Sequence, residues 1–580
     1  MKMSRISRFN KIYILEIILF GLIVTGVLPR ETAIFLAVGL AVYMVTAPLE
    51  DATLFFVRSI PLFIAIPITA NYDNLNTWRI LSIILFLKLA HITGLKYFLN
   101  IKEFSKYSKL LMILLVLAVL SIIPAVDKGA AISRIIFFVN FSLVGMVVYY
   151  LVQHEYMEVQ PPYKDSFSDR LVKNIAIPTI LVAVVGFIQL ASTYFIDIYQ
   201  FMRIWGEGIQ MRQFGVLWSE IAVRIGNTWF AYYGDQLSLR VFSLFPDSHS
   251  FPQFVLLGLP SIFAISLSTI YAYAQNVDVR MLIRKRVKMS ILWIPVMFLI
   301  IILSGTRGIW AASVGVVVII FVVLYWLKRD EKGFTPYHGR VNTLIKSYEV
   351  KSYEVQPRKM ILFKYLSLYM VVFFMLFAVA YPIFISPQFL LSKGDWGLFG
   401  NRIRSIIDFG ETSNSQRLEI WRASLESIKN RPLLGVGIGN FPVVLEQRIF
   451  LAKAGSSAHN IYLHIAAEMG ILALITAVWF LWLVFKKSYD NFINIMPSSS
   501  YHDRDNKTTS ENNVQHSVSN INDRMGGFLT IYYGATLIFV PWVLIYSLTD
   551  VALFDERAFL LFVTTISLIL ANKKASGEAS

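Results

Sequence analysis

The sequence predicts an all-α integral membrane protein, a polytopic bundle of about 12–14 transmembrane helices. Hydrophobic residues make up 56% of the 580 residues and charged residues only 16%. The mean hydropathy is +0.60. A soluble chain carries roughly a quarter charged residues. Long apolar stretches recur from one end of the chain to the other. Because only helices and closed barrels satisfy the backbone in lipid, stretches of this length indicate helices.

The apolar segments can be placed one by one along the chain. About fourteen of them approach the ~20 residues that a helix needs to cross the hydrocarbon core. They lie near residues 12–28, 32–48, 53–70, 80–98, 109–125, 135–152, 175–197, 251–274, 290–304, 308–327, 361–386, 461–485, 527–549 and 557–571. The third contains Arg58, and the ninth and fourteenth are short. The basic lead-in to the first is followed by an apolar run too long for a signal peptide, so we expect a retained span.

The lysines and arginines predict the orientation of the bundle. Four connecting segments are strongly basic: the start of the chain, and the segments after the fourth, eighth and tenth spans. If these are cytoplasmic, both termini lie on the cytoplasmic side of the inner membrane. Two long loops, roughly 198–250 and 387–460, then lie on the outer face. The net charge of +16 is a topology signal and does not indicate nucleic-acid binding.

Four regions are expected along the chain. Residues 1–174 hold the N-terminal transmembrane helices, about six in number. Residues 175–486 form a core membrane region that includes both outer loops. Residues 487–526 are a polar linker expected to be disordered and cytoplasmic, and residues 527–580 hold the C-terminal helices and a short tail.

Both outer loops contain aromatics, glycines and periodic apolar residues, so we expect them to be ordered and to contain short helices. Residues 201–225 form an amphipathic stretch that would lie along the membrane interface. In "SQRLEIWRASLESIKNRP", four apolar residues have helical spacing, with Ser415 as the N-cap and Pro432 just past the end. These four are Leu418, Trp421, Leu425 and Ile428.

The cations of the outer segments are mostly arginines. The first loop contains Arg203, Arg212, Arg224 and Arg240, and the second includes Arg402, Arg404, Arg417, Arg422, Arg431 and Arg448. Arg307 lies in the short turn "SGTRGIW". Arginine suits bidentate recognition of phosphate, so these residues are candidates for binding a phosphorylated lipid. The alternative is solvated cations paired with loop carboxylates. That alternative is weakest for Arg307, which is held between two spans.

Other kinds of site find little support in the sequence. There is no cysteine, so disulfides and thiolate chemistry are excluded. "GVGIGNF" fits a bend after Pro432 better than a nucleotide-binding loop, because no strand-to-helix context surrounds it. No cluster of His, Asp and Glu has the spacing of metal ligands, and no metal or cofactor is expected.

Ionisable and polar side chains stand at the entrance of the expected span 461–485. They are His459, Asn460, His464 and Glu468. Ionisable groups near hydrocarbon are costly and often functional. Simpler interpretations remain open: either His459 or Asn460 caps the helix, and His464 pairs with Glu468 at i,i+4. Asp550 and Asp555 are interpreted as structural acids of a loop.

Several of these segments together resemble the O-antigen ligase and polymerase superfamily. "SQRLEIWRASLESIKNRPLLGVGIGNFP" followed by "AHNIYLHIAAEMGI" resembles the family's conserved module. "LSGTRGIWAA" resembles an upstream turn, with Thr306 where serine is usual. "RVFSLFPDSHSF" resembles an outer segment, but Ser243 replaces a glycine. "LTDVALFDERAFLLF" resembles the closing aspartate-bearing stretch, and the resemblance extends over about residues 175–570.

The resemblance implies a metal-independent membrane glycosyltransferase. Such an enzyme moves a glycan from a polyprenyl-diphosphate carrier to an acceptor hydroxyl at the outer face. His459 would be the general base, and Arg307, Arg240 and Arg417 would bind the diphosphate, supported by Asn460, Glu468 and Arg422. The expected partners are the lipid-linked donor, a glycan, lipid-core or protein acceptor, and membrane lipids, without nucleic acid. Arginines can stabilise the dianionic leaving group, and histidine is a suitable base near neutral pH.

Two other function classes are compatible with the same helices. A transporter or flippase of lipid-linked oligosaccharide should show two related halves and charges near the membrane midplane. No internal repeat of that kind is visible. A non-catalytic assembly scaffold would not need the histidine and the arginines. Within the transferase class, ligase, polymerase and protein-directed transferase all remain open.

Overall fold

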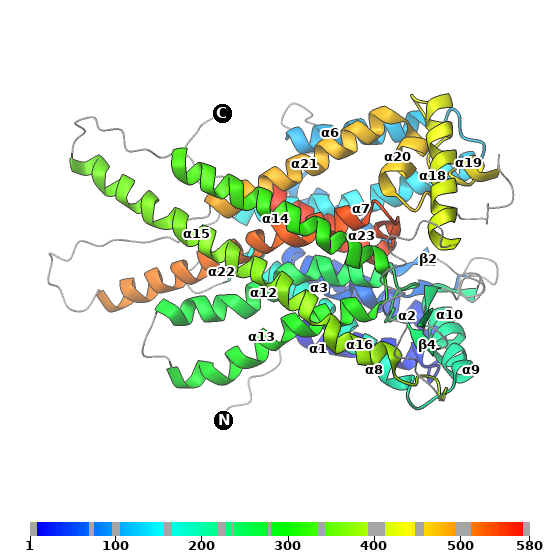
Figure 1. The fold of residues 1–580 in the computed structure, drawn as a ribbon, viewed down its shortest axis with the longest axis horizontal. Coiled ribbons are helices and arrows are strands. Elements are labelled where there is room, and N and C mark those ends of the chain that lie inside the picture. Colours follow the sequence, from blue (N-terminus) through cyan, green and yellow to red (C-terminus); the bar gives the residue numbers. More distant parts are fainter. Residues whose placement is uncertain are drawn as a thin grey trace.

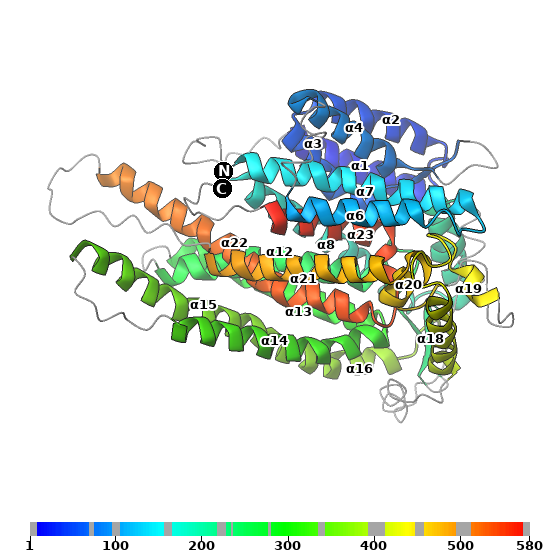
Figure 2. The ribbon, with the colours of Figure 1, turned by 90° about the horizontal axis from the view of Figure 1, so that it is seen from above.

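The computed structural model describes residues 8–68, 75–94, 105–155, 165–216, 228–233, 236–275, 280–333, 343–391, 412–446, 457–494 and 512–571. This part of the chain is almost entirely helical, as the composition predicts. Figure 1 shows long helices running side by side, and Figure 2 shows the same bundle from above. The fold is therefore an all-α polytopic bundle.

Seven described helices are long and apolar enough to cross a membrane: Lys128–Glu155, Phe167–Ser192, Ser250–Ser268, Arg307–Asp330, Lys359–Ile385, Ile471–Asn494 and Gly527–Tyr546. Shorter apolar helices cover Thr32–Thr46 and Ile291–Leu303. The third and the seventh of the long ones are 94% and 83% buried, against 28–50% for the other five. These two form the centre of the bundle, and the others offer more of their surface to lipid.

The N-terminal half begins with short helices that pack beside longer ones. Its elements are α1 (Arg8–Val24), α2 (Thr32–Thr46), α3 (Leu49–Ser59), η1 (Ile60–Leu62), β1 (Ala65–Ile66), β2 (Leu75–Asn76), α4 (Thr77–Thr93), α6 (Lys106–Leu120), α7 (Lys128–Glu155) and α8 (Phe167–Ser192). The third expected span is interrupted, because α3 ends before Pro61. Arg58 is satisfied there by Asn10 at 2.7 Å and by Asn174.

The first outer loop folds into short elements. They are α9 (Ile198–Phe201), the π-helical segment η3 (Met202–Gln210), α10 (Met211–Phe214), and the antiparallel strands β3 (Phe230–Tyr233) and β4 (Gln236–Leu239). Trp205 and Ile209 are buried on one side of η3, which agrees with the amphipathic pattern. Residues 217–225, the rest of that stretch, lie outside the described residues.

The remaining elements complete the bundle and cover one of its ends. They are α12 (Ser250–Gln275), α13 (Arg280–Leu303), α14 (Arg307–Gly333), α15 (Thr343–Met375), α16 (Phe377–Ile385), α18 (Thr412–Asn430), α19 (Pro442–Glu446), α20 (Ile461–Met469), α21 (Ile471–Asn494), α22 (Asn512–Tyr546), η5 (Ala552–Phe554) and α23 (Glu556–Ala571). α22 packs along α12 and α14, and α23 packs along α7. The expected linker 487–526 is helical at both ends, and residues 495–511 lie outside the described residues.

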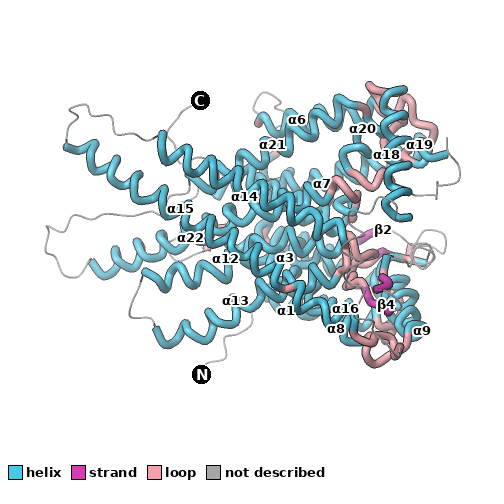
Figure 3. Tube along the Cα trace, in the orientation of Figure 1, coloured by secondary structure: helices cyan, strands magenta, loops and turns pink. Residues whose placement is uncertain are grey.

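Short elements gather at one end of the bundle. Figures 1 and 3 place α9, α10, α18, α19 and the strands at this end, while α13, α15 and α22 extend at the opposite end. Among the described residues, both outer loops of the sequence prediction therefore contribute ordered structure to the same end.

Helix α18 is present, but it begins before the expected N-cap, and its buried face is not made of the apolar residues alone. The helix begins at Thr412, so Ser415 lies inside it and is not the N-cap. Leu425, one of the four apolar residues at helical spacing, is 56% exposed. The buried face instead carries Ile420, Ala423, Ser424, Ser427 and Ile428. Small side chains allow a helix to approach its neighbours closely, and the apolar spacing alone does not reveal this.

The expected span 461–485 is two helices and not one. α20 ends at Met469 and α21 begins at Ile471, with Gly470 at φ 87° between them. The Ile471 N–H donates to the Pro432 carbonyl at 2.8 Å. A Cβ on Gly470 would lie 2.1 Å from the Leu433 carbonyl oxygen. The break exists because the backbone after Pro432 passes directly against it.

We expect Gly470→Ala to destabilise the protein by at least about 2 kcal/mol, because it combines a left-handed backbone with a backbone clash. Thermal unfolding in detergent measures the effect. Gly39→Ala is the matched control, since Gly39 lies within α2 with no atom within 4 Å of an added Cβ. Alanine there should be neutral or stabilising by up to ~1 kcal/mol. Equal unfolding temperatures for the two variants would show that the close approach at Gly470 is not needed.

Candidate active site

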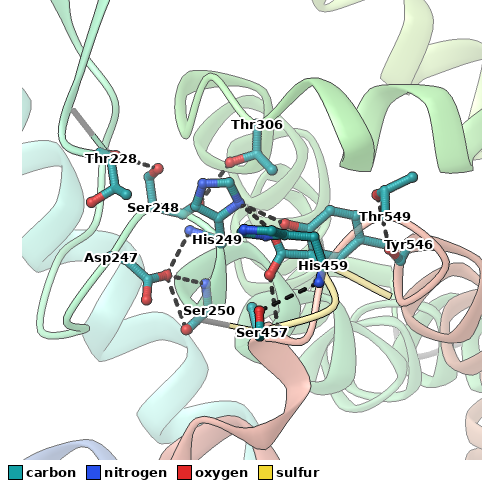
Figure 4. Close-up of polar contacts among 12 residues, drawn as sticks. Thr228, Asp247, Ser248, His249, Ser250, Thr306, Ser457, His459, Tyr546 and Thr549 are labelled. Atoms are coloured by element: carbon teal, nitrogen blue, oxygen red, sulfur yellow. Dashed lines mark hydrogen bonds and ion pairs between the residues drawn. The ribbon is translucent and has the colours of Figure 1, made fainter. Parts of the chain in front are cut away.

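Polar side chains from separate segments meet where the short elements cover the bundle. They come from the stretch between β4 and α12, the turn between α13 and α14, the residues before α20, and the end of α22 with the turn that follows. Figure 4 shows His249, Thr306, His459 and Tyr546 gathered in one place. Each segment is held by its own backbone contacts.

The stretch after β4 is fixed on both sides. The Arg240 N–H donates to the Trp229 carbonyl at 2.8 Å, and the Val241 N–H donates to the Leu303 carbonyl at 3.1 Å. Ser243 adopts φ 54°, a left-handed conformation that favours glycine. Its hydroxyl donates to the Val182 carbonyl at 2.6 Å. This left-handed residue is therefore held by a buried hydrogen bond.

The next residues turn into α12 through an aspartate. Oδ1 of Asp247 accepts from the backbone N–H of His249 at 2.8 Å and of Ser250 at 2.7 Å. A carboxylate in this position satisfies the first N–H groups of a helix. The turn places the His249 side chain beside Arg240.

Arg240 lies at the junction of this stretch with the turn before α14. Its side chain is buried, and Nη2 donates to Thr306 Oγ1 at 3.3 Å and approaches His249 Nε2 at 3.4 Å. The Thr306 hydroxyl in turn donates to the Ser248 carbonyl at 2.7 Å. Thr306 thus links Arg240 to the backbone before α12. Arg307, the next residue, begins α14 and is half-buried.

His249 is bound by two side chains from the end of α22 and the turn after it. Its Nδ1 lies 2.9 Å from Asp550 Oδ2 and 3.0 Å from the Tyr546 hydroxyl. Burial alone would raise the pKa of Asp550, but the neighbouring imidazoles and the Arg417 guanidinium hold it well below the usual carboxyl range. Asp550 is therefore a buried anion at the centre of the cluster.

His459 lies beside this anion with a left-handed backbone, at φ 45°. Burial lowers the pKa of His459 below its ordinary value of 6.5; Asp550 opposes this shift and Arg417 adds to it. Nδ1 of His459 has no hydrogen-bond partner among the described residues. One ring nitrogen is therefore not committed to a protein group.

The helix that follows is capped by Asn460 and not by His459. Oδ1 of Asn460 accepts from the N–H groups of Tyr462 at 2.9 Å and Leu463 at 3.0 Å. The Ile461 N–H donates to the Ser547 carbonyl at 2.8 Å, which ties this turn to the end of α22. Capping is thus accounted for without the histidine.

Helix α18 contacts the residues just before α20. Trp421 Nε1 donates to the Ala458 carbonyl at 3.0 Å, directly before His459. Arg417 is half-buried on this helix and close enough to influence the pKa values of both His459 and Asp550. Arg422 is exposed, five positions further along and on a different face of the helix. The structure brings Arg417 to the cluster but not Arg422.

Glu468 also lies apart from the cluster. It is nine residues beyond His459, roughly 13 Å along a helix. Its Oε1 accepts the Phe441 N–H at 3.1 Å and lies 3.4 Å from His464 Nε2. A cavity of about 20 Å³, enough for one water, borders Glu468, His464 and Arg134. Glu468 therefore holds the glycine-rich turn in place.

Not all of the candidate arginines belong to the described part of the chain. Arg224, Arg402, Arg404 and Arg448 lie outside the described residues. Among the residues that are described, no three His, Asp or Glu side chains gather in a way that could hold a metal ion.

Sequence reasoning missed His249 and Tyr546 and interpreted Asp550 as a structural acid. The signal for His249 was present, since it lies in the segment "RVFSLFPDSHSF" directly before a span. Tyr546 carried no signal, because an aromatic residue near the end of an apolar helix is ordinary. Only the fold brings residue 249 against residue 550.

Comparison with known families identifies part of this assembly. Residues 293–478 match the family model described as O-antigen ligase. This region belongs to the O-antigen ligase-like superfamily. The match includes Arg307, Arg417 and His459, whereas Arg240, His249 and Asp550 lie outside it and join the cluster through the fold. Comparison with curated proteins gives no match. This match supports an O-antigen ligase-like membrane enzyme.

Proposed function

We propose that the protein transfers a glycan from a polyprenyl-diphosphate carrier, such as undecaprenyl diphosphate, to an acceptor hydroxyl at the outer face of the inner membrane. The supporting observation is the convergence of Arg240, Arg417 and His459 from three segments around the buried Asp550. With both termini cytoplasmic, this end of the bundle faces outward, where envelope polysaccharides such as lipopolysaccharide are assembled.

The chemistry has two demands that this cluster can meet. The acceptor oxygen attacks the anomeric carbon as the bond between that carbon and the diphosphate oxygen breaks. The acceptor proton passes to the neutral His459 imidazole, and the carrier leaves as a diphosphate with added negative charge. Arginines fixed before the reaction stabilise that charge without reorganisation, and Arg307, Arg240 and Arg417 are the proposed donors. Arginine also offers the bidentate geometry that phosphate accepts.

The base must be neutral to accept a proton, and burial favours that form of His459. Asp550 then stabilises the imidazolium that forms, since an anion next to a histidine favours its charged form. His249 is less suited to accept the proton, because both of its ring nitrogens already have partners.

A transfer assay with purified protein in vesicles tests this function. The assay supplies a polyprenyl-diphosphate glycan and a hydroxyl-bearing acceptor, with and without EDTA. We expect the glycan on the acceptor and the free carrier diphosphate, at equal rates in both buffers. Movement of the intact lipid-linked glycan between leaflets without bond cleavage would instead indicate a flippase. Transfer that is abolished by EDTA would contradict metal independence.

A further inference from the structure

We propose that His249 is a positioning residue for the reaction: a neutral imidazole that links the buried Asp550 to Arg240 and holds the Arg240 guanidinium against the donor's diphosphate. This inference rests on the proposed function. It assigns a role to a residue that lies outside the matched family region.

The partners of the two ring nitrogens determine the tautomer. Arg240 Nη2 lies 3.4 Å from Nε2 of His249. A guanidinium has only donors, so Nε2 must accept and carries no proton. The proton is then on Nδ1, which lies 2.9 Å from Asp550 Oδ2 and 3.0 Å from the Tyr546 hydroxyl. A neutral histidine with Nδ1–H satisfies all of these contacts.

The hydrogen bonds from Asp550 through His249 to Arg240 explain how the Arg240 guanidinium is oriented. Asp550 is buried and anionic, and its hydrogen bond with Nδ1–H makes Nε2 a better acceptor. A carboxylate that accepts from one ring nitrogen fixes the tautomer and the orientation of the ring. Thr306 provides a second partner for the same Nη2 at 3.3 Å. Nη2 of the guanidinium is thus held by two partners, which contributes the preorganisation that electrostatic stabilisation of a leaving group requires.

The same geometry separates the roles of the two histidines. His249 has a partner on each ring nitrogen, so neither is available to take the acceptor proton. His459 has an Nδ1 without a partner among the described residues. Both imidazoles lie next to Asp550, but among the described contacts only the His249 ring lies within hydrogen-bond distance of its carboxylate. We therefore assign His249 to the donor side of the reaction and His459 to the acceptor side.

Replacing His249 by glutamine or by asparagine tests which of its two ring nitrogens matters for transfer. Glutamine can place a carbonyl oxygen near the position of Nε2, where it would accept from Arg240. Asparagine reaches only the position of Nδ1, where it can still donate to Asp550. If His249 acts through Nε2, His249→Gln should keep near-wild-type transfer. His249→Asn should lower kcat/KM for the donor roughly 10- to 100-fold, the size expected for a lost hydrogen bond to a charged group. The KM for the acceptor should stay unchanged in both.

A double-mutant cycle with Arg240→Ala completes the test, because residues that act through one another are not additive. His249→Asn should cause no further loss of donor affinity in the Arg240→Ala background. Binding of an unglycosylated polyprenyl diphosphate to the purified variants in vesicles provides this measurement independently of turnover. Equal losses in the Gln and Asn variants, or an Asn effect that persists without Arg240, would overturn the proposal. A wild-type protein that binds the carrier lipid but transfers no glycan would instead contradict the proposed function and leave this positioning test intact.

Discussion

Replacement of His459 by asparagine is expected to lower the rate of glycan transfer by about 10²–10⁴-fold, the usual contribution of a positioned general base. Donor affinity should change little, because the arginines that bind the diphosphate stay in place. Single-turnover transfer with the protein saturated in donor measures the chemical step directly, and carrier-lipid binding measures the affinity.

Asparagine is the suitable replacement for conformational reasons. His459 has a left-handed backbone, at φ 45°, which asparagine adopts more readily than most residues. The cap of α20 is Asn460, so changing His459 removes no capping hydrogen bond. His459→Ala adds backbone strain and serves as a comparison. If His459→Asn is expressed and folded normally and transfers glycan at the wild-type rate, the base lies elsewhere.

Replacement of Arg240 is expected to have the second large effect on glycan transfer. We expect Arg240→Ala to lower transfer by about 10²–10³-fold, the size found when one preorganised donor to a developing charge is removed. Arg240→Lys should be nearly as impaired, because lysine offers a point charge and cannot reproduce a planar, bidentate contact. A lysine there also loses the fixed approach to His249 and Thr306.

Lys429→Ala is the matched control, since it removes an exposed cation from the end of α18. It should transfer at the wild-type rate. Arg307→Lys measured alongside tests whether both arginines act through geometry. Full activity in Arg240→Lys would contradict bidentate recognition, and full activity in Arg240→Ala would remove this residue from the site.

The sequence predicts the fold class because hydropathy alone determines it. Apolar runs of about 20 residues have few alternatives to membrane helices. Where helices break and which of their faces are buried is harder to predict from the sequence. The break at Gly470 depends on the Leu433 carbonyl, 37 residues earlier, and no pattern within the apolar run reveals it. The buried face of α18 likewise depends on small residues that helical apolar spacing does not detect.

In the candidate site, too, some residues can be identified from the sequence, whereas their contacts cannot. Arg307, Arg417 and His459 can be singled out because they lie in motifs that resemble a known family. The proximity of Arg417 and His459 to Asp550, and the contact of His249 with Asp550, could not be predicted. Residues 249 and 550 are brought together by the packing of α12 against α22, a contact between segments about 300 positions apart.

The pH dependence of single-turnover transfer tests most directly the central claim that a buried, neutral His459 is the base. A base acts in its unprotonated form, so the rate should fall as the pH drops through the pKa of His459. Because burial lowers that pKa below 6.5, the wild-type rate at pH 6.5 should still exceed half of its plateau. This fall at low pH should be absent from the residual activity of His459→Asn. An identical fall in wild type and His459→Asn would contradict the claim, because another group would then be losing its proton-accepting form.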